Sequence, residues 1–363
     1  MGPLNVLALN SGSSTLKFGL YRVDSAGAAE LLGETVSAAD HPDAMTHVAS
    51  VLSASGMPAP DAIGHRIVHG GPALRQHCRI DDAVLQKLQA AAAFAPLHTP
   101  AAVEIIRFAQ QHFPGVAQVA CFDTQFHVGL PDVARVLPVA KELLSEGVQR
   151  YGFHGLSLES IVRQLGGEVP ERMVIAHLGN GASITAVKRG LSIDTSMGLT
   201  PSGGVIMGTR SGDLDPGVLV YLMREKQFDA AKLEALVDQR SGLLGISGLS
   251  GDMRRLHEAA ASNTDARLAI EMFCYSVRKQ VAAMMAVLGG LDMLVFTGGI
   301  GENDAQVRSE ICGGLSWIGV SLDEARNRAA SNPVSDGASR CQVLVLAAQE
   351  DEQIARHAWA LVA

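Results

Sequence analysis

The chain has 363 residues, of which 47% are hydrophobic and 18% charged, and its formal net charge is −8. This length and composition favour a soluble protein of two domains, and the acidic balance argues against a nucleic-acid-binding surface. The five cysteines are scattered singly, which favours reduced thiols and a cytoplasmic location. The first residues lack the basic segment of a signal peptide, and no apolar run is long enough for a membrane span.

The first third of the chain alternates predicted strands with predicted helices. Short apolar runs bounded by Gly, Pro, Asp or Asn predict strands at residues 5–9, 16–23, 63–69 and 117–122. Helical patterns follow at about 82–94 and 100–112, and Thr99 with Pro100 marks the beginning of the second helix.

One strand–turn–strand pattern occurs twice. Residues 6–23 read VLALNSGSSTLKFGLYRV and residues 174–190 read VIAHLGNGASITAVKRG, each with a turn of small residues between two strands. Turns rich in amides and hydroxyls suit a phosphate, although the first lacks the G-x-x-x-x-G-K-[ST] spacing. The repeat predicts two related domains whose hairpins hold a polyphosphate between them. The alternative is that both are ordinary hairpins.

The second half continues with helices and a third glycine-rich turn. Helices are expected at about 217–224, 229–238 and 264–288, and again over the C-terminal residues 352–362. The turn FTGGIGEN (Phe296–Asn303) follows an apolar strand and places Glu302 and Asn303 at the beginning of a helix. Loops at the carboxyl ends of parallel strands form binding crevices, so this turn is a third candidate for contact with a ligand.

The segment GHRIVHGG (Gly64–Gly71) predicts a binding face for a small carboxylate. Strand alternation places Arg66 and Val68 on one face, where a guanidinium would lie beside a small apolar side chain. His65 and His69 fall on the other face, and we expect them to be structural, because no third ligand suggests a metal site.

Three further polar residues lie beside glycines or at a strand end. Arg210 is in MGTRSGDLDPG, His154 is in RYGFHG, and Asp123 follows the strand that runs into CFDTQFH. Each alone is more often structural than catalytic. Together with the three glycine-rich turns they favour a phosphate-handling active site.

These motifs resemble the acetate kinase family, which belongs to the superfamily of sugar kinases, Hsp70 and actin. The motifs that carry the resemblance span residues 9–303 in the family's order: LNSGSSTLKF, GHRIVHGG, FAPLHTP, FDTQFH, RYGFHG, HLGNGAS, DTSMGLTP, GTRSGDLDPG, SGLSGDMR and FTGGIGEN. The resemblance implies an α/β fold of two duplicated RNase H-like domains with a nucleotide cleft between them. The expected domains are residues 1–149 with the C-terminal helix 354–363, and residues 150–353.

The resemblance also implies a role for each matching position. The implied catalytic residues are Asp123, His154 and Arg210, the last two as transition-state stabilisers. The implied acyl-binding residues are Arg66 for the carboxylate and Val68, Leu97 and Pro201 for the methyl group. The implied nucleotide-binding residues are Lys17, His177, Leu178, Gly179, Asn180, Gly181, Asp252, Met253, Arg254, Gly299, Ile300, Gly301, Glu302 and Asn303. The implied metal-binding residues are Asn10, Asp351 and Glu350.

The implied activity is reversible phosphoryl transfer from ATP to acetate, with Mg²⁺, or alternatively Mn²⁺, as the metal and ADP as the product. The acceptor carboxylate titrates near pH ~4, so it needs no general base, and we expect Asp123 to act through the metal and geometry. The expected partners are the two small substrates and a second copy of the chain, without nucleic acid or membrane. Propionate or butyrate kinase is the near alternative, and a nucleotide-switched binding protein of the same superfamily is the distant one.

The chain departs from the family pattern in four places. The segment from Asn10 to Arg66 is short, Thr99 replaces an Asn, and residues 156–158 read Leu-Ser-Leu instead of Thr-Ser-His. The C-terminal motif reads QEDEQIA, which places Asp351 where the family has a metal-linked Glu. A solvated charge run ahead of the final helix is the alternative interpretation of these acids.

Overall fold

The computed structural model describes residues 2–12, 15–37, 41–96 and 98–363. The chain forms two compact units, each built from segments that are distant in the sequence. Unit 1 contains residues 1–128, 154–160 and 349–363, and unit 2 contains residues 129–153 and 161–348. Residues 129–149, 154–160 and 349–353 therefore group differently from the division expected at residues 150 and 354.

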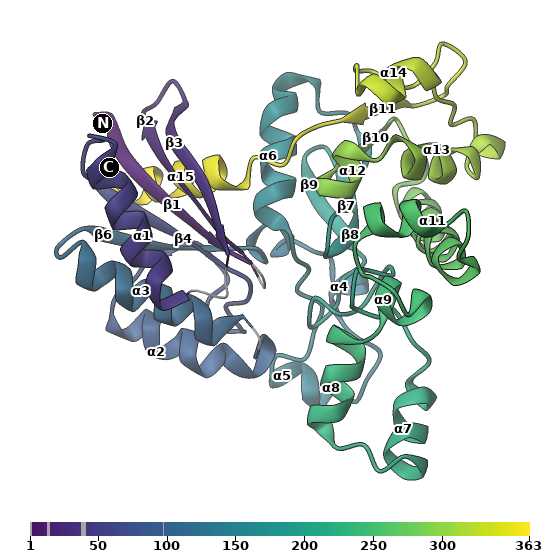
Figure 1. Cartoon of the computed structure of the whole chain (residues 1–363), viewed down its shortest axis with the longest axis horizontal. Helices are drawn as coiled ribbons and strands as arrows, with labels where there is room; N and C mark the ends of the chain where they lie inside the picture. Colours follow the sequence, from purple (N-terminus) through teal and green to yellow (C-terminus); the bar gives the residue numbers. More distant parts are fainter. Residues whose placement is uncertain (1, 13–14, 38–40, 97) are drawn as a thin grey trace. The chain divides into compact units, whose positions relative to one another are not determined.

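Unit 1 is built on a six-stranded sheet of order β3-β2-β1-β4-β6-β5 (Figure 1). Its strands are β1 (Leu4–Ser11), β2 (Thr15–Val23), β3 (Ala28–Ser37), β4 (Ala62–Ile67), β5 (Cys78–Arg79) and β6 (Ala117–Phe122). The first three strands form an antiparallel meander, whereas β1, β4 and β6 run parallel to one another. The carboxyl ends of β1, β4 and β6 consequently lie along one edge of this sheet.

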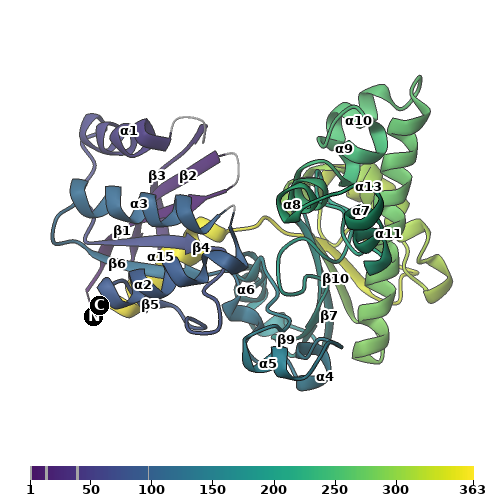
Figure 2. The same ribbon diagram turned by 90° about the horizontal axis from the view of Figure 1, so that it is seen from below.

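Helices cover both faces of the unit 1 sheet (Figures 1 and 2). The helices are α1 (His41–Ala54), α2 (Asp82–Ala90), α3 (Thr99–His112), the first turns of α6 (Gly155–Leu165), and α15 (Glu350–Val362). Because side chains alternate along a strand, Leu7 and Leu9 pack on the side of α1 and α3, whereas Val6 and Ala8 pack on α15. Both faces are apolar, as a parallel sheet covered on both sides requires.

Unit 2 repeats this plan with a five-stranded sheet of order β11-β10-β7-β8-β9. Its strands are β7 (Arg172–Leu178), β8 (Ala182–Lys188), β9 (Leu191–Thr195), β10 (Met293–Thr297) and β11 (Gln342–Val345). Again three strands form an antiparallel meander and the next two add in parallel. The matching strand orders confirm the duplication that the two hairpin sequences predicted.

The helices of unit 2 include the long α11 (Thr264–Leu288), whose buried face comprises Phe273, Val277 and Val281. The others are α4 (Asp132–Arg135), α5 (Glu142–Ser145), the last turn of α6, α7 (Pro216–Glu225), α8 (Ala230–Gln239), α9 (Gly242–Ser247), α10 (Met253–Ala259), α12 (Gly298–Asn303), α13 (Ala305–Gly313) and α14 (Glu324–Ala329). No helix in the described part of the chain has the length and apolarity that a membrane span needs. All five cysteines are free.

Three details differ from the sequence-based expectation. The strand expected over residues 63–69 ends at Ile67. The helix expected to begin at Glu302 begins at Gly298 and ends at Asn303. The final helix, expected to begin at residue 352, begins at Glu350, so Glu350 and Asp351 lie in the first turn of α15 and do not precede it. Favourable interaction of carboxylates with a helix N-terminus explains the last difference.

Candidate active site

Three predicted site residues meet at the carboxyl edge of the unit 1 sheet. Asn10 lies near the end of β1, Arg66 near the end of β4, and Asp123 follows β6 directly. Because these strands are parallel neighbours, the fold alone brings the three side chains together. The guanidinium of Arg66 donates from Nε and Nη2 to Asp123 Oδ2, at 3.0 and 2.7 Å, and from Nη1 to Asn10 Oδ1, at 3.1 Å.

The acidic first turn of α15 joins this cluster. The amide nitrogen of Asn10 donates to Glu350 Oε2 at 3.0 Å and to Asp351 Oδ1 at 2.7 Å. Arg66 Nη1 lies 3.8 Å from Glu350 Oε2. Both acids therefore meet Asn10, so these contacts do not select Asp351 over Glu350, and the solvated-run interpretation is wrong for these two.

Burial dominates the electrostatics of the cluster. Desolvation raises the pKa of Asp123 to about 6 against the opposing effect of Arg66, and the Glu350 carboxylate raises it further. Burial and Glu350 likewise raise the pKa of Asp351. The pKa of Arg66 is raised, because the neighbouring carboxylates outweigh its own desolvation. Arg66 therefore stays charged, and the three carboxylates around it leave an excess of negative charge.

This cluster fits a divalent cation. Asp123 Oδ1 is buried and has no hydrogen-bond partner among the described residues. Carboxylate oxygens are the preferred ligands of Mg²⁺. A cation beside Asp123, Glu350 and Asp351 would supply the missing partner and offset the excess charge. Lys17 pairs with Asn10 across the β1–β2 ladder, and its positive charge lowers the pKa of Asp351.

His154 is placed beside this cluster by a close backbone contact. Gly155 donates its N–H to the carbonyl of Asp123 at 2.8 Å, and a Cβ atom on Gly155 would lie 2.3 Å from that oxygen. Only glycine fits there, so the first residue of α6 lies directly against the backbone of Asp123, the predicted catalytic acid. His154 precedes it with φ 60°, a left-handed conformation that is uncommon outside glycine.

The predicted acyl pocket is only partly described. Val68 follows the end of β4 and is half-buried, so the strand alternation that placed it beside Arg66 does not extend to it. Leu97 lies outside the described residues. Pro201 is buried in unit 2, and its carbonyl accepts a hydrogen bond from Arg210 Nη1 at 3.3 Å. Membership of the three in one pocket remains a prediction.

Backbone contacts gather the predicted nucleotide-binding loops of unit 2. Thr297 pairs with His177 at the ends of β10 and β7, and a Cβ atom on Gly298 would lie 2.8 Å from the carbonyl oxygen of Leu178. Gly208 N donates to the carbonyl of Asn180 at 3.1 Å, and a Cβ atom on Gly251 would lie 2.7 Å from the Gly208 carbonyl oxygen. The turn 177–181 thus touches the loop of Arg210, which in turn touches the loop 250–254.

Some side chains in these loops have structural contacts. Glu302 Oε1 accepts from the backbone N–H groups of Gly298 and Ala348, each at 2.9 Å. Asp252 caps the N-terminus of α10 and pairs with the exposed Arg254, while Met253 is buried. The side chains of Glu302 and Met253 therefore stabilise the loops, and contact of these residues with a nucleotide remains a prediction. His65 and His69 are structural, as expected: His65 bonds to Gln118 at 2.8 Å and His69 Nδ1 accepts from Gly71.

Unit 2 also contains two cavities. One of about 330 Å³ is lined by Arg150, Asp194, Gln280 and neighbours, and one of about 590 Å³ by Arg326, Arg340, Asp323 and neighbours. None of the predicted site residues lines either cavity.

The sequence also gave no signal for a cluster of His77, Glu159 and His357 in unit 1, because these residues belong to separate elements and no motif contains them together.

Comparisons with known proteins agree over nearly the whole chain. Residues 28–356 match the model of the acetokinase family. An acetate kinase from Methylocella silvestris is 42% identical over 396 residues, covering 98% of each chain. A solved propionate kinase from Francisella tularensis superposes with a TM-score of 0.89 at 36% identity, over 99% of this chain and 100% of that one. An acetate kinase from Porphyromonas gingivalis gives a TM-score of 0.85 at 34% identity, with the same coverage.

Proposed function

Because the chain belongs to the acetokinase family, we propose that it transfers the γ-phosphoryl group of ATP to the carboxylate of acetate, reversibly. The observation that carries this proposal is the cluster at the edge of the unit 1 sheet. It combines a fixed guanidinium, which can bind a carboxylate, with acids that can hold Mg²⁺. A nucleotide-switched binding protein would need the acids but would give the half-buried guanidinium of Arg66 no substrate to bind.

The residues would act through position and charge. Phosphoryl transfer has little covalent chemistry for the protein to perform, so catalysis rests on alignment and charge neutralisation. The acceptor carboxylate is ionised at neutral pH, and no residue is needed to remove a proton from it. Arg66 would orient the acceptor, and Arg210 and His154 would donate hydrogen bonds to the transferring group.

Glu350 and Asp351, with Asn10 and Asp123, are the residues that would hold Mg²⁺. When bound with ATP, Mg²⁺ supplies positive charge that offsets the phosphate oxygens. In the structure Arg66 donates two hydrogen bonds to one oxygen of Asp123. A cation bound by Asp123 would weaken these hydrogen bonds and leave Arg66 better able to bind the acceptor carboxylate.

The acceptor is tested by measuring hydroxamate from acyl phosphate formed with ATP and acetate, propionate, butyrate or formate. We expect acetate to give the highest kcat/KM. Propionate is the second candidate, because the solved propionate kinase superposes with a TM-score of 0.89. One methylene is worth only about 1–3 kcal/mol in such a pocket, so the two acids are expected to compete. No acyl phosphate from any of the four acids, with folded protein, would contradict the proposal.

The acidic turn of α15 gives a prediction about metal requirement. Asp351→Ala removes a half-buried carboxylate 2.7 Å from the Asn10 amide and should raise the Mg²⁺ concentration for half-maximal rate about tenfold or more. Glu350→Ala should act in the same direction. Glu352→Ala is the control: Glu352 pairs with Arg356 at 2.8 Å, away from Asn10, and wild-type Mg²⁺ dependence is expected. Wild-type dependence in both Asp351→Ala and Glu350→Ala would remove the metal assignment.

We also propose that the chain forms a homodimer through α7. This helix is apolar, with Val218, Val220, Tyr221 and Met223 all exposed, and none of its residues is buried. A helix that is apolar all round needs a partner to cover it. Tyr221→Asp should therefore convert a dimer to a monomer in sedimentation or light scattering, whereas Lys226→Asp just beyond the helix should not. A wild-type monomer would contradict this proposal.

A cytoplasmic location is proposed as well, supported by the five free cysteines.

A further inference from the structure

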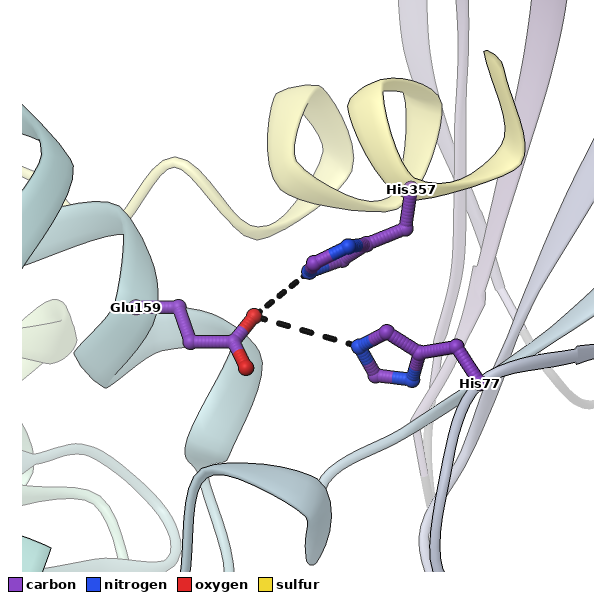
Figure 3. Close-up of side chains that lie close together, drawn as sticks. All are labelled: His77, Glu159 and His357. Carbon is purple, nitrogen blue, oxygen red and sulfur yellow. Dashed lines mark hydrogen bonds and ion pairs between the residues drawn. The ribbon is translucent and has the colours of Figure 1, made fainter. Parts of the chain in front are cut away.

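The carboxylate of Glu159 lies between two histidines in unit 1 (Figure 3). His357 Nε2, from α15, is 2.5 Å from Glu159 Oε2, and His77 Nε2, from the residue before β5, is 3.9 Å from the same oxygen. The two imidazole rings are 4.0 Å apart between centroids. Gln353 Nε2 adds a further donor at 3.4 Å. One carboxylate oxygen thus accepts from two side chains of α15 and faces the Nε2 of His77.

The tautomer of His77 is fixed by the backbone. Its Nδ1 accepts the N–H of Phe122 at 2.9 Å, so in the neutral ring the proton must lie on Nε2. The side chain is only 4% exposed, and Nε2 has no hydrogen-bond partner within the described structure other than the distant carboxylate it faces. His77 therefore presents a buried N–H to Glu159.

Two histidines and a glutamate could also form a zinc site, but this tautomer argues against it. A zinc ion on Nε2 needs the lone pair of that nitrogen, and the ring proton would then move to Nδ1. A proton on Nδ1 would point at the N–H proton of Phe122, and the hydrogen bond between them would be lost. The same clash opposes protonation of His77, and burial lowers its pKa. The hydrogen bond from His357 and the nearby ring of His77 outweigh burial and lower the pKa of Glu159 to about 2, so the acceptor is an ionised carboxylate.

Each element joined by Glu159 carries a residue of the candidate active site. Phe122, which bonds to His77, directly precedes Asp123. Glu159 itself is in α6, which begins on the Asp123 carbonyl immediately after His154. His357 is in α15, whose first turn carries Glu350 and Asp351. Movement of any one element would therefore displace a site residue relative to the other two.

We propose that Glu159 is a positioning residue that, through His77 and His357, fixes β6, α6 and α15 in the register that the active site of unit 1 requires. This inference rests on the proposed assignment of Asp123, His154, Glu350 and Asp351. Glu159 touches neither substrate nor metal, and its contribution is the alignment of the side chains that do. A displacement of about 1 Å at a reacting group can lower a rate by two orders of magnitude.

The test compares Glu159→Ala, Glu159→Gln and Arg79→Ala. Glu159→Ala should lower kcat on the order of 10- to 100-fold, with an unchanged KM for ATP. Glu159→Gln keeps an oxygen that can accept from both histidines, and its kcat should stay within about threefold of wild type. Arg79→Ala is the matched structural control, because Arg79 holds the other end of α15 through the carbonyls of Leu361 and Val362, at 2.7 and 3.0 Å. It should lower the melting temperature and leave kcat unchanged.

Equal kcat in Glu159→Ala and Arg79→Ala would overturn the positioning role. If Glu159→Ala does not fold, the test is ¹⁵N NMR of the histidines in the wild-type protein. His77 should then have an unprotonated Nδ1 and a protonated Nε2. A protonated Nδ1, or tight binding of Zn²⁺ that is lost in His357→Ala, would overturn the inference. The NMR and melting measurements do not require turnover. If the wild type forms no acyl phosphate, the proposed function is contradicted, but the NMR and melting results still test the arrangement of Glu159, His77 and His357.

Discussion

Replacing Arg210 by alanine should lower kcat by about 10³-fold or more while the KM for ATP changes little. Arg210 lies in a tight loop of unit 2, and its carbonyl accepts from Met207 N at 3.2 Å while Nη1 reaches the carbonyl of Pro201. A guanidinium held in this way is aligned before substrate binds. Its contribution should therefore appear in the transition state and not in ground-state binding of ATP.

The controls for Arg210 separate charge from geometry. Arg210→Lys keeps the positive charge but loses the planar fork, so only a small part of the activity should return. Arg189→Ala, which removes an exposed arginine paired with Glu171, should behave as wild type. An Arg210→Ala enzyme with normal kcat and a raised KM for ATP would show that the residue serves nucleotide binding.

Replacing Arg66 by alanine should lower both activity and stability. Its side chain is 15% exposed and pairs with Asp123, which is 2% exposed, so the variant leaves a buried carboxylate without its cation. Breaking one side of a buried pair typically costs about 3–5 kcal/mol of unfolding free energy. Chemical denaturation should show this loss in unit 1, and kinetics should show a higher KM for acetate together with a lower kcat.

A surface pair provides the comparison for Arg66. Arg172 and Asp292 also form an arginine–aspartate pair with several hydrogen bonds, but their side chains are 38% and 33% exposed. Arg172→Ala should therefore cost much less stability than Arg66→Ala and leave kinetics unchanged. Arg66→Lys should recover part of the stability but keep the raised KM for acetate, because one ammonium cannot reproduce the fork. A normal KM for acetate in Arg66→Ala would contradict the role as the carboxylate site.

The hairpins and parallel strands could be predicted because their signals are local. Each of the strands β1, β2, β7 and β8 is an apolar run that ends at glycine or a charged residue, and the repeat between the two halves predicted the duplicated fold. The antiparallel strand β3 was missed, since AAELLGETVS has neither clean alternation nor a dense apolar run. Helix α6 was missed as well, because no capping residue precedes Gly155 and the segment begins with glycine, which gives no signal for a helix start.

Long-range contacts explain what the sequence predicted in the site and what it did not. Asn10, Arg66 and Asp123 were predictable because each follows or ends a strand, and parallel strands share an edge. The meeting of Asn10 with Glu350 and Asp351 came only from resemblance to a family, since nothing local links β1 to α15. The pairing of Val68 with Arg66 was derived from an alternation that stops at Ile67. Glu159 gave no signal, because its partners are brought to it only by the fold.

The most direct measurement of the central claim is ³¹P NMR of the purified protein with acetate, ATP and Mg²⁺. The account predicts an acyl phosphate resonance that grows with ADP, requires acetate, and returns to ATP when ADP and acetyl phosphate are supplied instead. Asp123→Asn keeps the shape of the buried side chain but removes its charge. This variant should form acyl phosphate and, in the reverse direction, ATP much more slowly than the wild type. ADP and inorganic phosphate without acyl phosphate, or transfer that continues unchanged in Asp123→Asn, would contradict the account.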